Sequence, residues 1–218
     1  MVAYQPGSTA TSVTATVMAA AKESGQSPAT VAAAFLKEAK SHLVKQTGMK
    51  PMSSGSGDAP SGYRNIRKVV VPCSWQQGDF FFSDASTAGI IYGHNGLLSQ
   101  TCQTVEAVGG SAPVTAYNLG SHTVWTSSDA PARARGPNNV TAAARTKAAA
   151  VALSKRGKGY NNSFASNRHV ESTTYNCSQL VWAAWMSSAN LDLDKDGGWG
   201  VYPTDLRDSS RATTLFNF

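Results

Sequence analysis

Long apolar runs are missing from this sequence of 218 residues. No stretch approaches the roughly 18 consecutive apolar residues of a membrane-spanning helix, so we expect no membrane span. Long runs of lysine and arginine and the cysteine–histidine spacings of zinc sites are missing too. The formal net charge of +6 could serve contact with nucleic acid, anionic lipid or an anionic cell wall. Without such runs or spacings, we expect no nucleic-acid partner.

Charged residues are scarce as well, at 15% of the chain, so uncharged polar residues and glycine must cover much of the surface. The hydrophobic fraction of 41% is ordinary for a globular protein, and the length suits one full domain plus an appendage. The chain begins without the basic and apolar regions of a secretory signal. A polar, weakly charged composition nevertheless suits export, and we expect a secreted or cell-envelope protein.

The segment Tyr175–Trp185 places a cysteine at the start of a predicted helix. Its apolar residues fall at helical spacing, and Asn176 is a suitable N-cap residue. Cys177 would then lie in the first turn, where the positive end of the helix dipole favours the reactive thiolate. The alternative is that Cys177 is a small buried apolar residue. The polar neighbours Ser178 and Gln179 favour the reactive interpretation.

Histidine is absent after Cys177. A Cys–His enzyme built from this chain must therefore place its histidine before its cysteine. The four candidates are His42, His94, His122 and His169. His94 stands between Gly93 and Gly96, which leave room for another group to approach the ring and would not strengthen a strand. We expect His94 to be the base, with His122 and His169 as rivals and a purely structural histidine as the alternative.

Two segments around the cysteine resemble the nucleophile region of NlpC/P60-type papain-like cysteine peptidases and amidases. They are Gly-Lys-Gly-Tyr-Asn at 157–161 and Asn-Cys-Ser-Gln-Leu-Val at 176–181. The resemblance implies that Cys177 is the nucleophile and that Tyr160 lines the active site. The family usually has aspartate before its cysteine, whereas this chain has Asn176.

The order of the parts resembles the circularly permuted branch of that family. Gly78-Asp-Phe-Phe-Phe82 and Gly93-His-Asn-Gly-Leu-Leu98 are similar to the Gly-Asp and Gly-His segments that precede the cysteine there. The resemblance extends over residues 69–206 and implies a permuted papain-like fold. In that fold an antiparallel sheet or small barrel packs on the nucleophile helix.

A catalytic imidazole needs a third group to hold its ring and tautomer. If the chain turns around Gln100, residues whose numbers sum to 200 face each other, and His94 faces Glu106. We therefore expect Glu106 to orient His94. An exposed strand carboxylate is the alternative reading of Glu106, and Gln103 is the alternative third residue.

The segment after the nucleophile helix is rich in aspartate, glycine and aromatic residues. Its sequence Asp192-Leu-Asp-Lys-Asp-Gly197 matches the first half of an EF-hand loop, but the twelfth position is Pro203 instead of glutamate. We expect an Asp/Gly-rich turn and no metal or cofactor. Trp199 and Tyr202 follow and could contact substrate, or could simply pack in the core.

The rest of the pattern predicts an α+β protein. Residues 1–60 read as two helices over 10–48, separated at Gly25, and a Ser/Gly/Pro linker; residues 61–218 read as the catalytic domain. Predicted strands lie at 68–72, 80–82, 89–98, 104–108, 114–119 and 122–126. An alanine-rich helix is predicted at 141–155, with Arg145 and Lys147 on its solvated face.

The combined hypothesis is a monomeric cysteine hydrolase that cleaves amide bonds of cell-wall peptides or N-acyl peptides through a thioacyl-enzyme intermediate. Cys177, His94 and Glu106 would be catalytic, and Tyr160, Trp199 and Tyr202 would contact the oxyanion or the substrate. If Cys177 is the nucleophile, Cys73 and Cys102 remain as a disulfide pair; three reduced thiols are the alternative. Two other functions stay open: a lecithin:retinol acyltransferase-like acyltransferase or lipid hydrolase on the same scaffold, and a non-catalytic binding module.

Overall fold

The computed structural model describes residues 8–42, 65–85 and 92–218, and within them the fold is α+β, as expected. The helices are α1 (Ala10–Ser24), α2 (Pro28–Ser41), α3 (Ala142–Ser154), α4 (Cys177–Ala189) and α5 (Pro203–Asp208). The strands are β1 (Arg67–Val70), β2 (Phe80–Ser83), β3 (His94–Gln100), β4 (Gln103–Glu106), β5 (Thr115–Asn118), β6 (Thr123–Thr126), β7 (Arg133–Pro137), β8 (Gly159–Tyr160), β9 (Thr174–Tyr175) and β10 (Ala212–Asn217). The expected linker at 51–60 and the start of the expected strand at 89–98 lie outside the described residues.

The main sheet has the strand order β10-β7-β2-β3-β4-β5, and each neighbouring pair is antiparallel. Strands β1 and β6 form a separate antiparallel pair, and β8 and β9 form a short parallel pair. The sequence analysis did not predict β7 or β10. Among the described helices, none is both long and apolar enough to cross a membrane.

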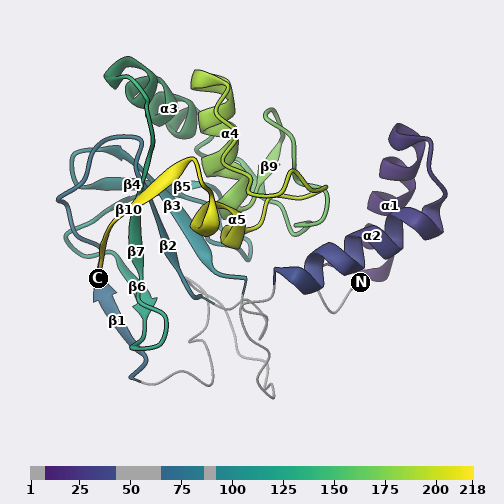
Figure 1. Cartoon of the computed structure of the whole chain (residues 1–218), viewed down its shortest axis with the longest axis horizontal. Coiled ribbons are helices and arrows are strands. Elements are labelled where there is room, and N and C mark those ends of the chain that lie inside the picture. Colours follow the sequence, from purple (N-terminus) through teal and green to yellow (C-terminus); the bar gives the residue numbers. More distant parts are fainter. Residues whose placement is uncertain (1–7, 43–64, 86–91) are drawn as a thin grey trace.

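Helices α3 and α4 lie side by side over one face of the main sheet (Figure 1). The alanines of α3 that face the sheet are fully buried, and their small side chains let the two helices approach closely. Trp185 of α4 reaches the strand layer and donates a hydrogen bond to the carbonyl oxygen of Gly78 at 3.0 Å. A side chain at Gly78 would collide with that indole, since a Cβ there would lie 2.8 Å from Trp185 Cζ2.

The opposite face of the sheet packs on a second apolar cluster. Phe81 and Leu98 contribute to it from β2 and β3, and Val124 contributes from β6. Because successive residues of a strand point to opposite faces, Phe80 and Leu97 belong instead to the cluster under α4. The β2–β3 pair is therefore buried on both faces and forms a rigid centre beside the start of α4.

Arg145 does not lie on a solvated face as we expected. Its guanidinium Nη1 is 2.5 Å from Asp79 Oδ1, and only 2% of the Asp79 side chain is exposed. The other Asp79 oxygen accepts a hydrogen bond from the backbone N–H of Gln76 at 2.8 Å. The Gly-Asp segment thus anchors α3 to the turn that leads into β2, and buried Asp79 requires Arg145 as its counter-charge.

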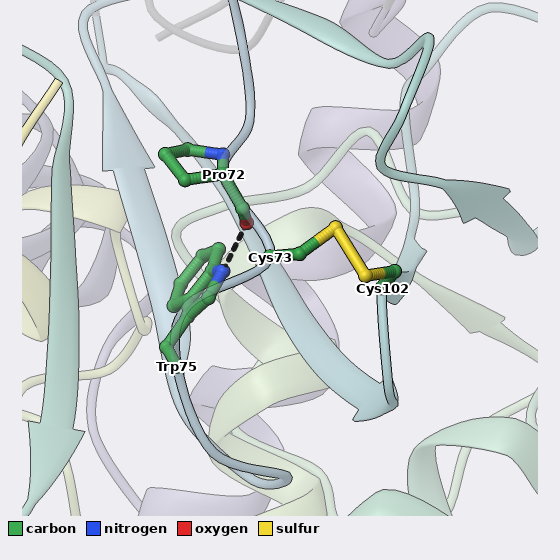
Figure 2. Close-up of a disulfide and its surroundings, with 4 residues drawn as sticks. All are labelled: Pro72, Cys73, Trp75 and Cys102. Atoms are coloured by element: carbon green, nitrogen blue, oxygen red, sulfur yellow. Dashed lines mark hydrogen bonds between the residues drawn. A yellow bond between two sulfur atoms is a disulfide. The ribbon is translucent and has the colours of Figure 1, made fainter.

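A disulfide joins Cys73 to Cys102 (Figure 2) and links the segment after β1 to the turn between β3 and β4. Cys177 is the free thiol. Next to the disulfide, the Trp75 indole N–H donates to the carbonyl oxygen of Pro72. A cross-link that spans 29 residues stabilises the fold by roughly 3–4 kcal/mol, because it lowers the conformational entropy of the unfolded chain.

The register between β3 and β4 differs from the expected one. Leu97 pairs with Val105 and Leu98 with Thr104, so the paired numbers sum to 202 instead of 200. The turn lies later in the chain because Cys102 adopts a left-handed conformation, with φ at 55°. A bulge also interrupts the pairing between Leu98 and Gln100. Continuing this register places Glu106 opposite Gly96, two residues from His94.

The N-terminal helices pack on the loop that follows α4. Phe35 of α2 contacts Trp199 edge-on, with ring centroids 5.5 Å apart, and His42 stacks on Tyr202 at 4.3 Å. Glu38 accepts hydrogen bonds from the backbone N–H groups of Trp199 and Gly200. Figure 1 shows α1 and α2 on the opposite side of the molecule from β1 and β6.

Candidate active site

Cys177 is the first residue of α4, and Asn176 caps that helix as expected. Asn176 Oδ1 accepts hydrogen bonds from Gln179 N at 2.9 Å, Asn167 Nδ2 at 3.0 Å and Ser178 Oγ at 3.2 Å. This triple contact fixes the first turn of α4. Cys177 is therefore held at the positive end of the helix dipole, with only 2% of its surface exposed.

His94 lies within hydrogen-bonding reach of the Cys177 thiol, and both line the same narrow pocket. His94 Nε2 is 2.8 Å from Glu106 Oε2, which leaves Nδ1 as the ring nitrogen available to the thiol. Burial opposes a charge on the His94 ring. The hydrogen bonds with Cys177 and Glu106 outweigh burial and raise the pKa of His94 to about 10. The imidazolium form is therefore favoured at neutral pH.

Glu106 is completely buried and lies between two histidines. Its Oε1 is 2.9 Å from His122 Nε2 and accepts a hydrogen bond from Thr104 Oγ1 at 2.5 Å. Burial alone would raise the pKa of Glu106, but the contacts with His122 and His94 lower it to about 2. The carboxylate thus stays charged and can hold the His94 ring.

Gly96 makes the contact between Glu106 and His94 possible despite the unexpected register. A Cβ at position 96 would lie 2.5 Å from Glu106 Cγ and 2.8 Å from Glu106 Cδ. The Glu106 side chain therefore crosses β3 over the bare backbone of Gly96 and reaches His94 diagonally. The sequence analysis noted that this glycine leaves room for another group, and the group is Glu106.

Tyr160 lines the pocket together with Cys177 and His94. Burial and a negative charge on Cys177 both raise the pKa of Tyr160 well above its ordinary value. The phenol therefore keeps its proton and can donate a hydrogen bond. Asn161, the next residue, donates a hydrogen bond from Nδ2 to Gln179 Oε1 on α4 at 3.0 Å and so ties the Tyr160 strand to α4.

Trp199 and Tyr202 are not among the residues that line this pocket. Tyr202 is completely buried and stacks behind the pocket wall on Phe164, with ring centroids 5.8 Å apart. Trp199 packs against α2, as described above. Their placement follows the core-packing alternative that the sequence left open.

The rival residues lie elsewhere. His169 is exposed, and Gln103 hydrogen-bonds with Gln100 and Ser99 at the far end of the β3–β4 hairpin. His122 reaches the site from the other side, through Glu106, with its ring stacked on Tyr117. From the sequence, His122 was considered only as a base, and Asn167 was not considered. Their partners lie in other elements of the fold, Glu106 in β4 for His122 and the cap of α4 for Asn167, so only the tertiary structure shows them.

Comparison with known proteins shows the family of this chain. No protein-family model matches the sequence. The uncharacterized protein YycO of Bacillus subtilis (strain 168) is 30% identical over 225 aligned positions, which cover 98% of this chain and 83% of YycO. A crystal structure of the metalloprotein yiiX from Escherichia coli O157:H7 (DUF1105) is 17% identical, with a TM-score of 0.49, and the match covers 66% of this chain and 97% of that one. The chain belongs to the same protein family as YycO.

Proposed function

We propose that this protein is a cysteine hydrolase with the circularly permuted NlpC/P60-like, papain-like arrangement. The proposal rests on the arrangement of Cys177, His94 and Glu106. The thiol of Cys177, at the first position of α4, lies beside the His94 imidazole, and the buried Glu106 carboxylate holds that imidazole. These are the groups that nucleophilic acyl transfer requires: a nucleophile, a base and a residue that orients the base. The alternative of a non-catalytic binding module requires Cys177 and His94 to lie apart. It is disfavoured because both residues line the same pocket.

In the acylation step, the Cys177 thiolate attacks the carbonyl carbon of an amide, and the carbonyl π electrons move onto oxygen. The tetrahedral intermediate then collapses, the carbon–nitrogen bond breaks, and the His94 imidazolium gives its proton to the leaving amine. The products are a thioester on Cys177 and a free amine. Glu106 keeps the His94 ring in place while its charge changes.

Deacylation uses the same residues in reverse. Neutral His94 takes a proton from water as that water attacks the thioester carbon. The carbon–sulfur bond breaks, the carboxylic acid product leaves, and the Cys177 thiolate and His94 imidazolium are restored. No further reactant is needed.

The oxyanion of each tetrahedral intermediate can meet two donors from this chain. One is the backbone N–H of Cys177, which has no partner within α4 because it lies in the first turn. The other is the protonated hydroxyl of Tyr160. A donor of this kind contributes on the order of 3 kcal/mol to the transition state.

We propose peptidoglycan peptides or other N-acyl peptides as the substrate class. The excess of 19 basic over 13 acidic residues suits an anionic cell wall. The Cys73–Cys102 disulfide supports an oxidising, extracytoplasmic location. The three large apolar side chains that the described surface exposes, Met18, Val70 and Leu215, come from separate elements, so nothing here favours the lipid-directed alternative.

The test is hydrolysis of cell-wall fragments and acyl-peptides by Cys177→Ala and Cys177→Ser variants. Both should lose turnover while circular dichroism stays that of the wild type. Iodoacetamide near neutral pH should label Cys177 alone, and His94→Ala should slow this labelling, whereas His169→Ala, which changes an exposed histidine, should not. Near wild-type turnover in either Cys177 variant would refute the assignment.

A further inference from the structure

A cluster of metal-ligand side chains lies outside the catalytic pocket, where α2 meets the loop after α4. Ligand atoms of Glu38, His42 and Asp196 lie within 4.8 Å of one another, and so do those of Asp194, Asp196 and Asp205. The two groups share Asp196. They bring together residues separated by more than 150 positions in the sequence, so no local pattern predicts the cluster.

Two buried atoms point into this cluster without a hydrogen bond. Asp205 is completely buried; its Oδ2 accepts from Tyr202 N at 2.7 Å, but its Oδ1 has no hydrogen-bond partner. His42 is 7% exposed; its Nδ1 is bound to Thr204 Oγ1 at 2.9 Å, but its Nε2 has no hydrogen-bond partner. Asp205 Oδ1 lies 3.3 Å from His42 Nδ1, and His42 Nε2 lies 3.4 Å from Asp196 Oδ2. Buried polar atoms are normally paired, so two orphaned ones in a single cluster indicate a ligand.

The charge of the cluster indicates the same kind of ligand. Glu38, Asp194, Asp196 and Asp205 contribute four carboxylates. Of the cations nearby, Arg168 pairs with Asp192 and Asp194 at 2.5 and 2.6 Å, and Lys195 and Arg207 pair with Asp208 at 3.6 and 2.7 Å. Converging carboxylates repel one another when ionised, and a bound cation removes that repulsion.

Space is available for an ion and its water. A cavity of about 220 Å³ adjoins His42, Asp196 and Asp205. Lys195 and Arg207 also line it, and both pair with Asp208. Asp196 opens the cluster to solvent, since 46% of its side chain is exposed. An ion could therefore enter from this side.

We propose that this junction binds a divalent cation, with Glu38, His42, Asp194, Asp196 and Asp205 as its candidate ligands. Several carboxylates with a single imidazole suit an oxygen-preferring ion such as Ca²⁺ or Mn²⁺ better than a thiophilic one. The arrangement is not an EF-hand. Asp192, the first residue of the EF-hand-like sequence, turns away and accepts a hydrogen bond from Trp182 Nε1 at 2.8 Å.

The ion would fasten the N-terminal helices to the catalytic domain. Glu38 lies in α2 and His42 is its C-cap residue, whereas the three aspartates come from the loop after α4 and from α5. The same loop packs behind the pocket wall through Tyr202. The proposal is independent of the cysteine chemistry and can be tested without a substrate.

The experiment is thermal unfolding of the full chain after treatment with EDTA, followed by addition of Ca²⁺, Mn²⁺ or Mg²⁺. At about 100 times the dissociation constant, a bound ion should raise Tm by roughly 5–10 °C. Asp205→Asn should abolish the rise. In EDTA this variant should be about as stable as the wild type, because its amide oxygen can still accept the hydrogen bond from Tyr202 N–H.

The matched control is Asp192→Asn, which changes a carboxylate of the same loop outside the cluster. It should keep the full rise in Tm. Isothermal titration calorimetry of the wild type should show saturable binding that Asp205→Asn lacks. The proposal is overturned if none of the three ions changes the wild-type Tm, or if Asp205→Asn and Asp192→Asn respond to them alike.

Discussion

Replacing Gly96 with alanine should separate Glu106 from His94 without changing either residue. The new Cβ would lie 2.5 Å from both Glu106 Cγ and Phe81 Cε1, whereas carbon atoms in contact settle about 3.5–4 Å apart. Each neighbour must therefore retreat by about 1 Å. Both are completely buried, and overpacking of this kind destabilises a core by about 1–3 kcal/mol.

The same retreat should weaken catalysis. A shift of about 1 Å would lengthen the 2.8 Å contact between His94 Nε2 and Glu106 Oε2 beyond hydrogen-bonding reach. A hydrogen bond to a charged group contributes about 1.5–3 kcal/mol, which corresponds to a loss of roughly 10- to 100-fold in kcat/KM. The rate of Cys177 alkylation at pH 7 should fall with it, because the imidazolium of His94 becomes less stable.

The assays are urea unfolding, iodoacetamide labelling and kcat/KM for hydrolysis. Gly120→Ala is the control, since a Cβ there would meet no atom within 4 Å. It should match the wild type in all three. If Gly96→Ala has the wild-type free energy of unfolding and the wild-type labelling rate, Glu106 does not depend on the bare backbone at position 96, and the reasoning fails.

Three further predictions follow from the same network and from the disulfide. His122→Gln should lower kcat/KM about fivefold with KM unchanged, because it removes one of the two histidine contacts of Glu106, a contact worth about 1 kcal/mol; steady-state kinetics measures this, and an unchanged kcat would contradict it. The lowered pKa of Glu106 stabilises the fold fully above pH 4.5, and this stabilisation is lost as the pH falls through about 2. The raised pKa of His94 stabilises the fold fully below pH 6.5, and this stabilisation is lost as the pH rises through about 10. Urea unfolding across pH should therefore show a smaller acid loss in Glu106→Gln and a smaller alkaline loss in His94→Gln than in the wild type; equal slopes would show that these contacts do not stabilise the fold. Reducing Cys73–Cys102, or changing both to serine, should lower the free energy of unfolding by roughly 3–4 kcal/mol, and an unchanged denaturation midpoint would argue against this pairing.

Local sequence determined where α2, α3 and α4 begin and where α1 ends, whereas α2 ends at Ser41 instead of near Gly48 and α5 was not predicted. Asn176, Thr141 and Ser27 cap α4, α3 and α2 through hydrogen bonds to residues three positions later. Gly25 ends α1 in a left-handed conformation. Such features depend on neighbours within one helical turn, so the sequence alone places Cys177 at a helix start.

Strand pairing depended on the tertiary structure. Strand β7 contains Gly136 and Pro137, which weaken any strand pattern, yet it pairs with β2 and β10. The β3–β4 register followed the conformation of Cys102 and a bulge, neither of which composition reveals. A shift of two positions kept Glu106 on the His94 face, since side chains alternate with period two.

The sequence by itself pointed to the proposed nucleophile, Cys177, the proposed base, His94, and the carboxylate that contacts the base, Glu106, because few residue types offer these chemistries. Only the tertiary structure placed His122 against Glu106 and Asn167 against Asn176, and it buried Tyr202 behind the pocket. The tertiary structure also brought Glu38 of α2 close to Asp196 in the loop after α4. These contacts join different elements of the fold, from Asn167 and Asn176, 9 residues apart, to Glu38 and Trp199, 161 residues apart. Their geometry follows from packing and register, which no short window of sequence contains.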